Sequence, residues 1–558
     1  MKDRYAQLDM ATRRARAARR TFPFEPPPGT TEHVPVVIVG AGPVGLAAAA
    51  DLAQHGIANL VLDKVNTLSD GSRAICWAKR SLEICDRLGI AGRMLDKGIT
   101  WNIGRVFCGD KPEPLYSFDL LPDKAQKFPA FINLQQYYTE EYLIDSLAAP
   151  ARGVRWQHEV RALRQSATGV ELEVQTPAGA YRLHCDYVIA ADGCRSAIRT
   201  QLGLDFEGRT FEDNFLIADV RMQAPFPAER RFYFNAPFND GRTALMHQQP
   251  DGLWRLDFQL GWQIDREAAI REENVTPRVR AMLGPDIEFE YEWVSLYTFQ
   301  CRRMQRFVHD RVIFAGDAAH LVSPFGARGA NSGLQDIDNL GWKLAAVLKG
   351  TAGAHLLASY DEERCHGADE NIANSTRATD FMAPKSVAET AFRDAVLELA
   401  EHHAFARGFV NSGRLSTPCS QHASSLTTAD GDPFDTSLRA GDVCLDAAVL
   451  HRGQAGWLLE QLGRDFCCLS FLGSDAPLTD GLRDTLPAGV RLLTVGDTPA
   501  ADLHDPSGRL RQRYDGAPGT TYLIRPDQHI AGRWRRLDAT AVARALARAT
   551  GAIHPSRA

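Results

Sequence analysis

The chain has 558 residues, of which 44% are hydrophobic and 24% are charged, and its formal net charge is −6. This composition is typical of a soluble globular protein with several domains, and the mildly acidic balance gives no support for a nucleic-acid partner. No run approaches the roughly 20 continuous apolar residues of a membrane span, so no membrane partner is expected. Eleven cysteines without a C-x-x-C pair indicate reduced thiols of a cytoplasmic protein, and no zinc-type spacing predicts a metal site.

Residues 1–33 are expected to form an extension ahead of the organised chain. A basic cluster at residues 13–20 is followed by prolines at positions 23, 26, 27 and 28. Because no apolar region follows the basic cluster, neither a secretory nor a twin-arginine export signal is complete. We expect a solvated, partly helical extension, and a packing arm in an oligomer is the alternative.

A dinucleotide-binding unit is predicted where the organised chain begins. Residues 34–39 form an apolar, β-branched run, which leads into a Gly-x-Gly-x-x-Gly loop and an alanine-rich helix at residues 46–53. A second apolar run ends in Asp63, 23 residues after the first glycine, which is the spacing of a carboxylate that binds a ribose hydroxyl. The residues predicted to hold the dinucleotide are Gly40, Gly42, Pro43, Gly45, Asp63 and Lys64. NAD-linked dehydrogenases and FAD enzymes both use such a unit.

Two later segments favour FAD. Residues 187–191 resemble a buried strand that ends in Asp192, and residues 311–315 resemble another that ends in Gly316 and Asp317. A glycine-rich loop and a helix follow the second strand, and the helix dipole would stabilise the negative charge of a reduced flavin. Asp317 offers a carboxylate to the hydroxyls of a sugar-like chain. From the loop and the start of the helix we expect contacts by Pro324, Gly329, Ala330 and Asn331.

With these three motifs in order, residues 34 to about 350 resemble the class A FAD-dependent aromatic hydroxylases, the superfamily of phenol hydroxylase and p-hydroxybenzoate hydroxylase. The resemblance extends to Arg73 and Gln136, and it implies that both lie along the FAD. It also implies that Asp192 lies near the pyrophosphate and the route of the nicotinamide. Asp63 and Lys64 stand where the family commonly has glutamate and arginine.

The resemblance implies an α/β fold: a Rossmann-like FAD-binding domain with an inserted antiparallel β-sheet substrate domain, and a C-terminal thioredoxin-like α/β domain. The expected boundaries are an extension at 1–33, an FAD-binding domain at 34–205 and 301–410 with part of the substrate region near 100–130, a substrate-binding sheet at 206–300, a linker at 411–437 and a thioredoxin-like domain at 438–558.

Antiparallel strands are predicted in the substrate region. Segments 231–234, 244–248 and 254–260 are strand-like and are separated by turn sequences. In the third segment the apolar side chains alternate with Arg255, Asp257 and Gln259, which therefore share the other face. That polar face is either solvated or, as the resemblance implies, the roof of the substrate cavity.

The sequence does not identify the group that activates the substrate. Phenol hydroxylases also have an arginine at the place of Arg255, but they have a tyrosine where Asp257 stands. Some of them carry an acid at the place that Ile75 occupies here. His320 follows a strand-to-loop turn, and we expect it to satisfy backbone groups. The candidate catalytic residues are Arg255, Asp257, His247 and Tyr233.

The C-terminal region is predicted to be structural. Apolar runs at 466–472 and 490–495 alternate with helical or turn segments, and the resemblance identifies this region with the thioredoxin-like domain of the larger family members. Thiol redox chemistry needs a low-pKa cysteine pair, which the region lacks, so a role in dimer packing is expected. Cys467 and Cys468 lie in an apolar run and are expected to be two packed thiols.

The resemblance implies hydroxylation of a phenolic or other electron-rich aromatic compound by a cytoplasmic homodimer. NADPH or NADH would reduce FAD, dioxygen would add to the reduced flavin as a C4a-hydroperoxide, and the ring would attack its distal oxygen. The alternatives are a flavin-dependent halogenase, whose W-x-W-x-I-P segment is absent, an oxidase, an NAD-dependent dehydrogenase and a catalytically silent flavin-binding protein.

Overall fold

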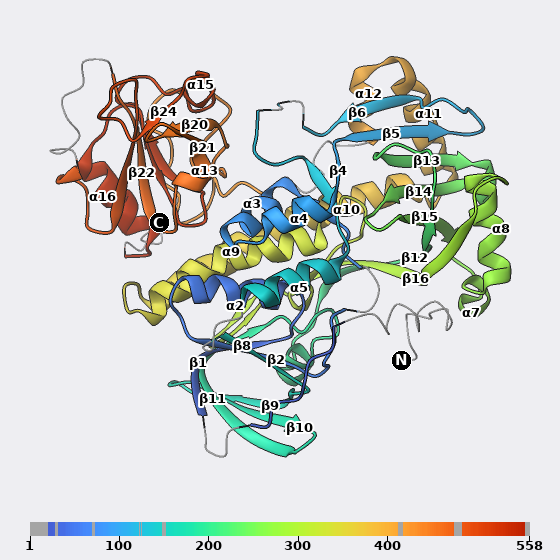
Figure 1. Cartoon of the computed structure of the whole chain (residues 1–558), viewed down its shortest axis with the longest axis horizontal. Coiled ribbons are helices and arrows are strands. Elements are labelled where there is room, and N and C mark those ends of the chain that lie inside the picture. The colour runs from blue at the N-terminus through green and yellow to red at the C-terminus, as the bar shows by residue number, and fades with distance from the viewer. Residues whose placement is uncertain are drawn as a thin grey trace.

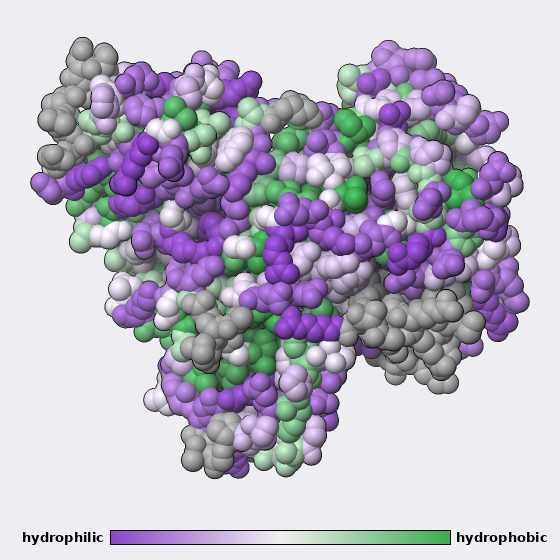
Figure 2. Space-filling model, viewed as in Figure 1, coloured by the Kyte–Doolittle hydropathy of each residue, from purple (hydrophilic) through white to green (hydrophobic). Residues whose placement is uncertain are grey.

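The computed structural model describes residues 20–27, 32–69, 73–121, 123, 125–147, 152–410, 417–473 and 483–552. Three large sheets organise them, and Figure 1 shows helix α9 (Gly329–Leu348) running between the groups of elements that the sheets form. On the face shown in Figure 2 hydrophilic residues predominate, and the hydrophobic ones form small separate areas. Within the described ranges, none of the helices has the length and apolar character that a membrane crossing requires.

The first sheet contains the predicted dinucleotide-binding unit. Its strand order is β17-β18-β11-β1-β2-β8, and the antiparallel strands β10 and β9 extend from β11. Because β18, β11, β1, β2 and β8 run parallel, their carboxyl ends lie along one edge of the sheet. The strands are β1 (Glu32–Val39), β2 (Asn59–Asp63), β8 (Arg152–Trp156), β9 (Glu159–Gln165), β10 (Val170–Thr176), β11 (Gly179–Ala190), β17 (Val308–His309) and β18 (Val312–Phe314).

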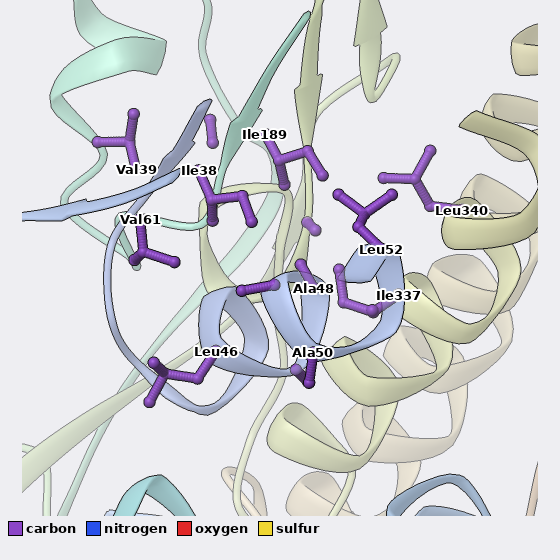
Figure 3. Close-up of a cluster of buried hydrophobic side chains, with 14 of the residues drawn as sticks. Ile38, Val39, Leu46, Ala48, Ala50, Leu52, Val61, Ile189, Ile337 and Leu340 are labelled. Atoms are coloured by element: carbon purple, nitrogen blue, oxygen red, sulfur yellow. The ribbon is translucent and has the colours of Figure 1, made fainter. Parts of the chain in front are cut away.

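Helix α2 (Pro43–Gln54) is buried along most of its length because it lies between this sheet and α9. Figure 3 shows its side chains among Ile38 and Ile189 of the sheet and Ile337 and Leu340 of α9. The helices cross closely, since a Cβ atom on Gly341 of α9 would come within 1.7 Å of an Asp51 carboxylate oxygen. The predicted helix after the glycine loop and the leucine-patterned helix after Asp317 are therefore confirmed, and they pack on each other.

The second sheet has the order β19-β16-β12-β15-β14-β13-β5-β6. Its pairs are antiparallel except β13 with β5, which are parallel. The three predicted strand segments are β13, β14 and β15, and they are confirmed. The strands are β5 (Ile103–Cys108), β6 (Tyr116–Asp119), β12 (Glu207–Met222), β13 (Arg230–Ala236), β14 (Arg242–Gln248), β15 (Leu253–Gly261), β16 (Phe289–Arg303) and β19 (His320–Leu321).

The two faces of the second sheet differ in chemistry. Trp254, Leu256 and Phe258 form an apolar core with side chains of helices α7 (Arg266–Ala269) and α8 (Glu272–Leu283) and the residue that follows α7. On the opposite face Arg255 and Gln259 are buried as well. A solvated polar face is therefore wrong for this strand.

Further helices and a small sheet β3-β7-β4 complete this part of the chain. Residues 358–410 are mainly helical and form α10, α11 and α12. These elements are β3 (Cys76–Ala78), α3 (Lys79–Arg87), α4 (Ala91–Lys97), β4 (Ile99–Trp101), β7 (Phe131–Asn133), α5 (Gln136–Ser146), α6 (Ala197–Gln201), α10 (Ala358–Met382), α11 (Val387–His402) and α12 (Ala404–Val410).

The third sheet lies in the C-terminal part of the chain, drawn in orange to red in Figure 1, and has the order β21-β20-β24-β23-β22-β25-β26. Strands β22 and β23 are parallel, and β25 and β26 continue the sheet antiparallel. The elements are β20 (Ala448–His451), β21 (Gln454–Trp457), α13 (Leu458–Gln461), β22 (Phe466–Phe471), β23 (Val490–Val495), β24 (Leu503–His504), α15 (Arg509–Tyr514), β25 (Thr521–Ile524), β26 (Ile530–Trp534) and α16 (Ala539–Ala549).

The adjacent cysteines of β22 are packed thiols, as predicted. Cys467 and Cys468 are free and buried, and they belong to the cores on opposite faces of the sheet. Burial raises the pKa of Cys467 to about 11 and raises that of Cys468 further. Both sulfurs therefore stay protonated and serve as small apolar side chains.

Part of the N-terminal extension lies on the first sheet. Phe22 is buried and stacks on Trp156 of β8, with 4.3 Å between the ring centroids. The Phe22 backbone N–H donates to the carbonyl of Asn66 at 2.9 Å. A solvated extension is therefore wrong at this residue. Residues 13–19 of the basic cluster lie outside the described residues, and Arg20 pairs with Asp145 at 2.6 Å.

Candidate active site

The predicted cofactor motifs meet at one edge of the first sheet. Gly40 follows β1, Asp63 ends β2, Asp192 follows β11 and Gly316 follows β18. Backbone hydrogen bonds join these ends: Gly40 donates to Leu62, Ala191 to Val39, and Ala315 to Ala190, at 2.9, 2.9 and 3.1 Å. Segments almost 280 residues apart thus form one surface, because neighbouring parallel strands end at the same edge.

The glycine loop packs as a phosphate-binding turn requires. Gly40 has a φ of +109°, and a Cβ atom on Gly45 would lie 1.9 Å from the Gly40 carbonyl oxygen. Side chains larger than hydrogen would therefore separate the loop from α2. Gly42 precedes α2 and gives it no side-chain cap, so the first N–H groups of the helix are available to an anion.

Two predicted carboxylates lie at this edge. Asp63 accepts hydrogen bonds from the backbone N–H groups of Ala41 at 2.6 Å and Val65 at 3.0 Å, and these bonds fix it beside the glycine loop. Asp192 accepts one from Ile198 at 3.2 Å through Oδ2. Its Oδ1 is buried and has no hydrogen-bond partner among the described residues. A buried carboxylate oxygen without a donor is suited to a donor that a ligand brings.

The start of α9 is held against the Gly316 turn. The Gly316 N–H donates to Asp336 of α9 at 2.9 Å, and a Cβ on Gly333 would lie 3.3 Å from the Gly316 Cα. Asp317 stays exposed beside this contact. Arg328 precedes the helix without a side-chain cap, so the N–H groups of Gly329 and the next residues have no helical partners.

The side chain of Asn331 holds the start of α9 against neighbouring elements. Its Oδ1 accepts a hydrogen bond from the Ala78 N–H at 2.9 Å, and its Nδ2 donates to the carbonyls of Cys76, at 2.9 Å, and Ala327. The side chain therefore joins α9 to β3 and α3.

Gln136 and Arg73 lie on neighbouring segments. Gln136 donates to Ser69 at 2.9 Å and to Glu140 at 2.8 Å, and it accepts from the Ala74 N–H at 3.2 Å. Arg73 has an exposed side chain, and its carbonyl oxygen lies 3.4 Å from an Arg255 nitrogen of the second sheet. The segment that carries Arg73 therefore lies between the first sheet and the polar face of the second.

His320 binds a side chain and not the backbone groups expected for it. Its Nε2 lies 2.7 Å from Asp336, which also binds Arg364 at 2.7 Å. All three side chains are buried. This group holds α9 and α10 against the turn that contains Gly316.

A row of polar side chains crosses the second sheet on its inward face. Register pairs join Arg230 to His247, His247 to Arg255, Arg255 to Asp219 and Asp219 to Trp293. Cross-strand neighbours share a face, so all five side chains point to the same side. Asp257 lies two positions further along β15 on the same face.

Arg255 is neutralised within this row. Its Nε and Nη2 donate to the two oxygens of Asp219 at 2.8 Å each, and both residues are almost fully buried. Burial alone would lower the pKa of Arg255, but the Asp219 carboxylate outweighs it and holds that pKa above its usual value. Arg255 is therefore a fixed cation whose charge is already balanced.

His247 and Asp257 form a pair beside it. His247 Nε2 lies 3.5 Å from Asp257 Oδ2, and the imidazole is buried. Burial, together with the Arg230 charge, lowers the pKa of His247 to about 4, so the ring is neutral at neutral pH. Its Nδ1 has no hydrogen-bond partner among the described residues. With the proton on Nε2 toward Asp257, Nδ1 carries a lone pair that can accept a proton.

The structure does not bring Tyr233 to this row, and its place among the catalytic candidates is a correction. Along β13 it alternates with Arg230 and points to the other face. There it stacks on Phe107 at 4.9 Å and packs edge-on against Phe238 at 5.3 Å, next to the apolar core under α8. Arg255, His247 and Asp257 are the candidates that the fold brings together.

Sequence reasoning missed Asp219 and Arg230, and it included Glu140 in the resemblance without showing its contacts. Asp219 lies between apolar residues in the middle of a strand, and a lone acid there indicates a buried partner. Glu140 accepts hydrogen bonds from Ser69 and Gln136. Arg230 opens a strand next to a second arginine, and only the register shows which of the two points inward.

Comparison with known proteins places these observations in a family. Residues 33–375 match the model of the family described as FAD binding domain. The chain is 32% identical over 511 residues to a flavin-dependent monooxygenase of Mycobacteroides abscessus, which covers 89% of this chain and 96% of that protein. It is 27% identical over 514 residues to a 3-(3-hydroxy-phenyl)propionate/3-hydroxycinnamic acid hydroxylase of Mycolicibacterium smegmatis, with 89% and 90% covered.

Solved structures share the fold over nearly the whole chain. The flavin-dependent monooxygenase PieE, in complex with FAD and substrate, superposes with a TM-score of 0.79 at 24% identity and covers 94% of this chain. Aklavinone-11 hydroxylase, in a ternary complex with FAD and aklavinone, superposes with a TM-score of 0.74 at 23% identity and the same coverage. The superpositions cover 100% of the PieE chain and 100% of the aklavinone-11 hydroxylase chain.

Proposed function

The chain belongs to the FAD-binding-domain family of flavin-dependent monooxygenases, and we propose that it uses FAD, NADH or NADPH, and dioxygen to hydroxylate a phenolic or otherwise electron-rich ring. The observation that carries the proposal is the meeting of four cofactor motifs at one sheet edge, opposite a buried polar row on the second sheet.

The residues at the sheet edge fit FAD. We assign the pyrophosphate to the Gly40–Gly45 loop and the start of α2, with Pro43 as its first residue, and a ribose hydroxyl to Asp63, with Lys64 beside it. We assign the rest of the cofactor to Asp192, Asp317, Arg73 and Gln136. The flavin ring system is assigned to the turn from Pro324 to Asn331, with the backbone of Ala330. When bound, FAD supplies the reduction by the nicotinamide and the activation of dioxygen.

The polar row is assigned to the substrate. The balanced pair Arg255 and Asp219 would position the ring through a fixed guanidinium. His247 Nδ1 would accept the proton of the substrate hydroxyl, and Asp257 would stabilise the imidazolium that forms. Withdrawing this proton raises the electron density of the ring carbons next to the hydroxyl, which is the property that aromatic hydroxylation needs.

The domain division of the sequence is also proposed for the protein. Strands β5, β6 and β12–β16 support a substrate sheet at 206–300 with a contribution from near 100–130. A parallel pair, β22 and β23, followed by an antiparallel hairpin and a terminal helix supports a thioredoxin-like domain at 438–558 after a linker at 411–437. The cytoplasm is the proposed location.

A homodimer is proposed from a second surface. Helices α11 and α12 both expose large apolar side chains, and exposed apolar surface supports an interaction site there. The residues are Val387, Phe392, Leu399, Phe405 and Phe409. Sedimentation of the wild type and of a Phe405→Asp variant would test the surface. We expect the wild type to be a dimer and the variant to be a monomer. A monomeric wild type would overturn the proposal.

The proposed reaction is tested with purified protein loaded with FAD. Oxidation of NADH or NADPH under air is followed with a panel of phenols, hydroxybenzoates and hydroxyphenylpropionates, and the products are identified by mass. We expect at least one ring compound to stimulate oxidation and to gain one oxygen atom. If no compound does so, or if the protein binds no FAD, the proposed function is wrong.

A further inference from the structure

We propose that Arg230 binds an anionic oxygen of the substrate, so that the compound hydroxylated is a phenol that carries a carboxylate or an equally acidic enol. This inference rests on the proposed function, because it names the substrate class of the same site.

Arg230 is a buried cation without a protein counter-ion. Its exposed fraction is 4%, and its Nε and Nη1 are buried without a hydrogen-bond partner. The guanidinium lies over the Phe232 ring, 4.9 Å from the centroid. Among the described residues, no carboxylate lies within 4.0 Å of it. Burial lowers the pKa of Arg230, which shows that its charge is poorly compensated.

Three other buried arginines of the chain are ion-paired. Arg255 binds both oxygens of Asp219, Arg80 binds Asp338 and Glu83, and Arg364 binds Asp336. A buried charge without a partner costs several kcal/mol, so folded proteins usually pair it. Arg230 departs from this pattern on the inward face of the sheet, where the substrate is proposed to bind.

The position of Arg230 fits a ligand group. It is the direct cross-strand neighbour of His247, and its charge acts on Cys76 of β3 and on Asp257. The carbonyl of Cys76 is bound by Asn331 in the first turn of α9. Arg230 therefore lies between the proposed base and the segment assigned to the flavin ring.

The chemistry of the group selects the ligand. A planar guanidinium donates hydrogen bonds to carboxylate oxygens in a fixed geometry, and it is less hydrated than an ammonium group. The Phe232 ring below it favours the cation but supplies no negative charge. An anion on the substrate would complete the site, whereas a neutral phenol would leave the guanidinium unpaired.

Binding to matched ligands tests the inference. The probes are 3-hydroxybenzoate, 3-(3-hydroxyphenyl)propionate and 3-hydroxycinnamate, each with its primary amide, and a cyclic 1,3-diketone with its O-methyl enol ether. Dissociation constants are measured by fluorescence on the FAD-loaded wild type and on Arg230→Met and Arg230→Lys. Arg231→Met is the control, because Arg231 points to the other face and pairs with Glu229 at 2.8 Å.

We expect at least one acid to bind the wild type ten-fold or more tightly than its neutral analogue, and Arg230→Met to abolish that ratio. Arg230→Lys should keep part of it, and Arg231→Met all of it. Preference for the carboxylates or for the diketone distinguishes the two sources of the anion. The inference is overturned if no acid is preferred, or if the ratio survives in Arg230→Met. The proposed function fails separately, if no ring compound is hydroxylated.

Discussion

Two regions of this protein bury many polar groups and treat them in opposite ways. At the junction with the C-terminal sheet, the turn between β25 and β26 inserts Arg525 and Asp527 against α9 and α10. Arg525 binds both Glu363 and Asp527, Lys343 donates to Glu363 at 2.7 Å, and Trp342 donates to Asp527 at 3.2 Å. Each of these charges has an opposite charge in contact with it.

The inward face of the second sheet is different. Arg230, His247, Trp293 and Ser295 each have a buried nitrogen or oxygen without a hydrogen-bond partner among the described residues. An unpaired polar atom costs about 1–3 kcal/mol, and a paired one contributes to stability. The first region therefore holds two parts of the chain together. The second leaves polar atoms unpaired for a ligand to bind, and this lowers the stability of the fold.

The electrostatics of the two regions agree with this difference. Burial alone would raise the pKa of Glu363, but Arg525 and Lys343 outweigh it and hold that pKa well below its usual value. On the sheet, burial dominates and lowers the pKa values of both His247 and Arg230. The charged form of Glu363 is thus stabilised at the junction, and the charged forms of His247 and Arg230 are destabilised on the sheet.

The largest effect is expected at the junction. Glu363→Gln would leave Arg525 and Lys343 without their shared carboxylate, and breaking a buried ion pair costs about 3–5 kcal/mol. Urea unfolding of the full chain should show this loss. Glu362→Gln is the matched control, since Glu362 binds Ser425 at an exposed position. Equal stability of the two variants would contradict the assignment of Glu363 as the centre of the junction.

On the sheet, the same kind of change should affect catalysis. His247→Gln removes the proposed base, and product formation should fall about 10²–10³-fold, within the range of general-base catalysis. The content of bound FAD should not change. His33→Gln, at an exposed position paired with Asp186, should keep full activity. If His247→Gln retains its rate, His247 is not the base.

The pH dependence of stability sharpens the comparison. The folded pKa of His247 is about 4 and its usual value is 6.5, so the unfolded chain binds the proton more readily. Stability from this group is fully present above pH 6.5 and is lost as the pH falls toward 4, by up to about 1.4 kcal/mol per unit. Arg230, Asp257 and Arg255 are the charges that act on the ring.

Urea unfolding at pH 6.5 and pH 5 measures this effect. The wild type should lose about 1.5 kcal/mol more than His247→Gln over this interval, because only the wild type has the buried imidazole. Parallel curves for the two proteins would show that His247 has an ordinary pKa in the folded chain.

The smallest expected effect on stability, that of Arg230→Met, is the sharpest test of the difference between the two regions. Arg230→Met removes an unpaired buried charge and keeps an apolar side chain, so its free energy of unfolding should lie within about 0.5 kcal/mol of the wild type or above it. A loss as large as that of Glu363→Gln would show that Arg230 has a structural partner. The comparison between the two regions would then be wrong.

The cofactor edge could be predicted in detail because its motifs are local. A glycine loop after a strand, a strand that ends in an acid and a loop before a helix each show their geometry within about ten residues. The parallel order of β18, β11, β1 and β2 then brings them to one edge. Asn331 is among the residues predicted to contact the cofactor, and the sequence did not show that its side chain joins α9 to β3.

The polar row could be predicted only in part because it depends on register. Alternation along β15 shows that Arg255 and Asp257 share a face, and nothing in the sequence pairs Arg255 with Asp219, 36 residues earlier. Tyr233 was a candidate because it lies in a predicted strand, and the structure points it to the other core. A shift of one residue in register reverses the face of every side chain, so strand pairing decides which groups meet.

The sequence by itself determined the dinucleotide loop, the ordered FAD motifs and the resemblance to aromatic hydroxylases, because these features depend on short-range geometry. Only the tertiary structure decided that His247 pairs with Asp257, that Arg255 is balanced by Asp219 and that Arg230 is left without a counter-ion. The physical reason is that burial and pairing are properties of side chains from distant strands, and those properties exist only after the sheet has formed.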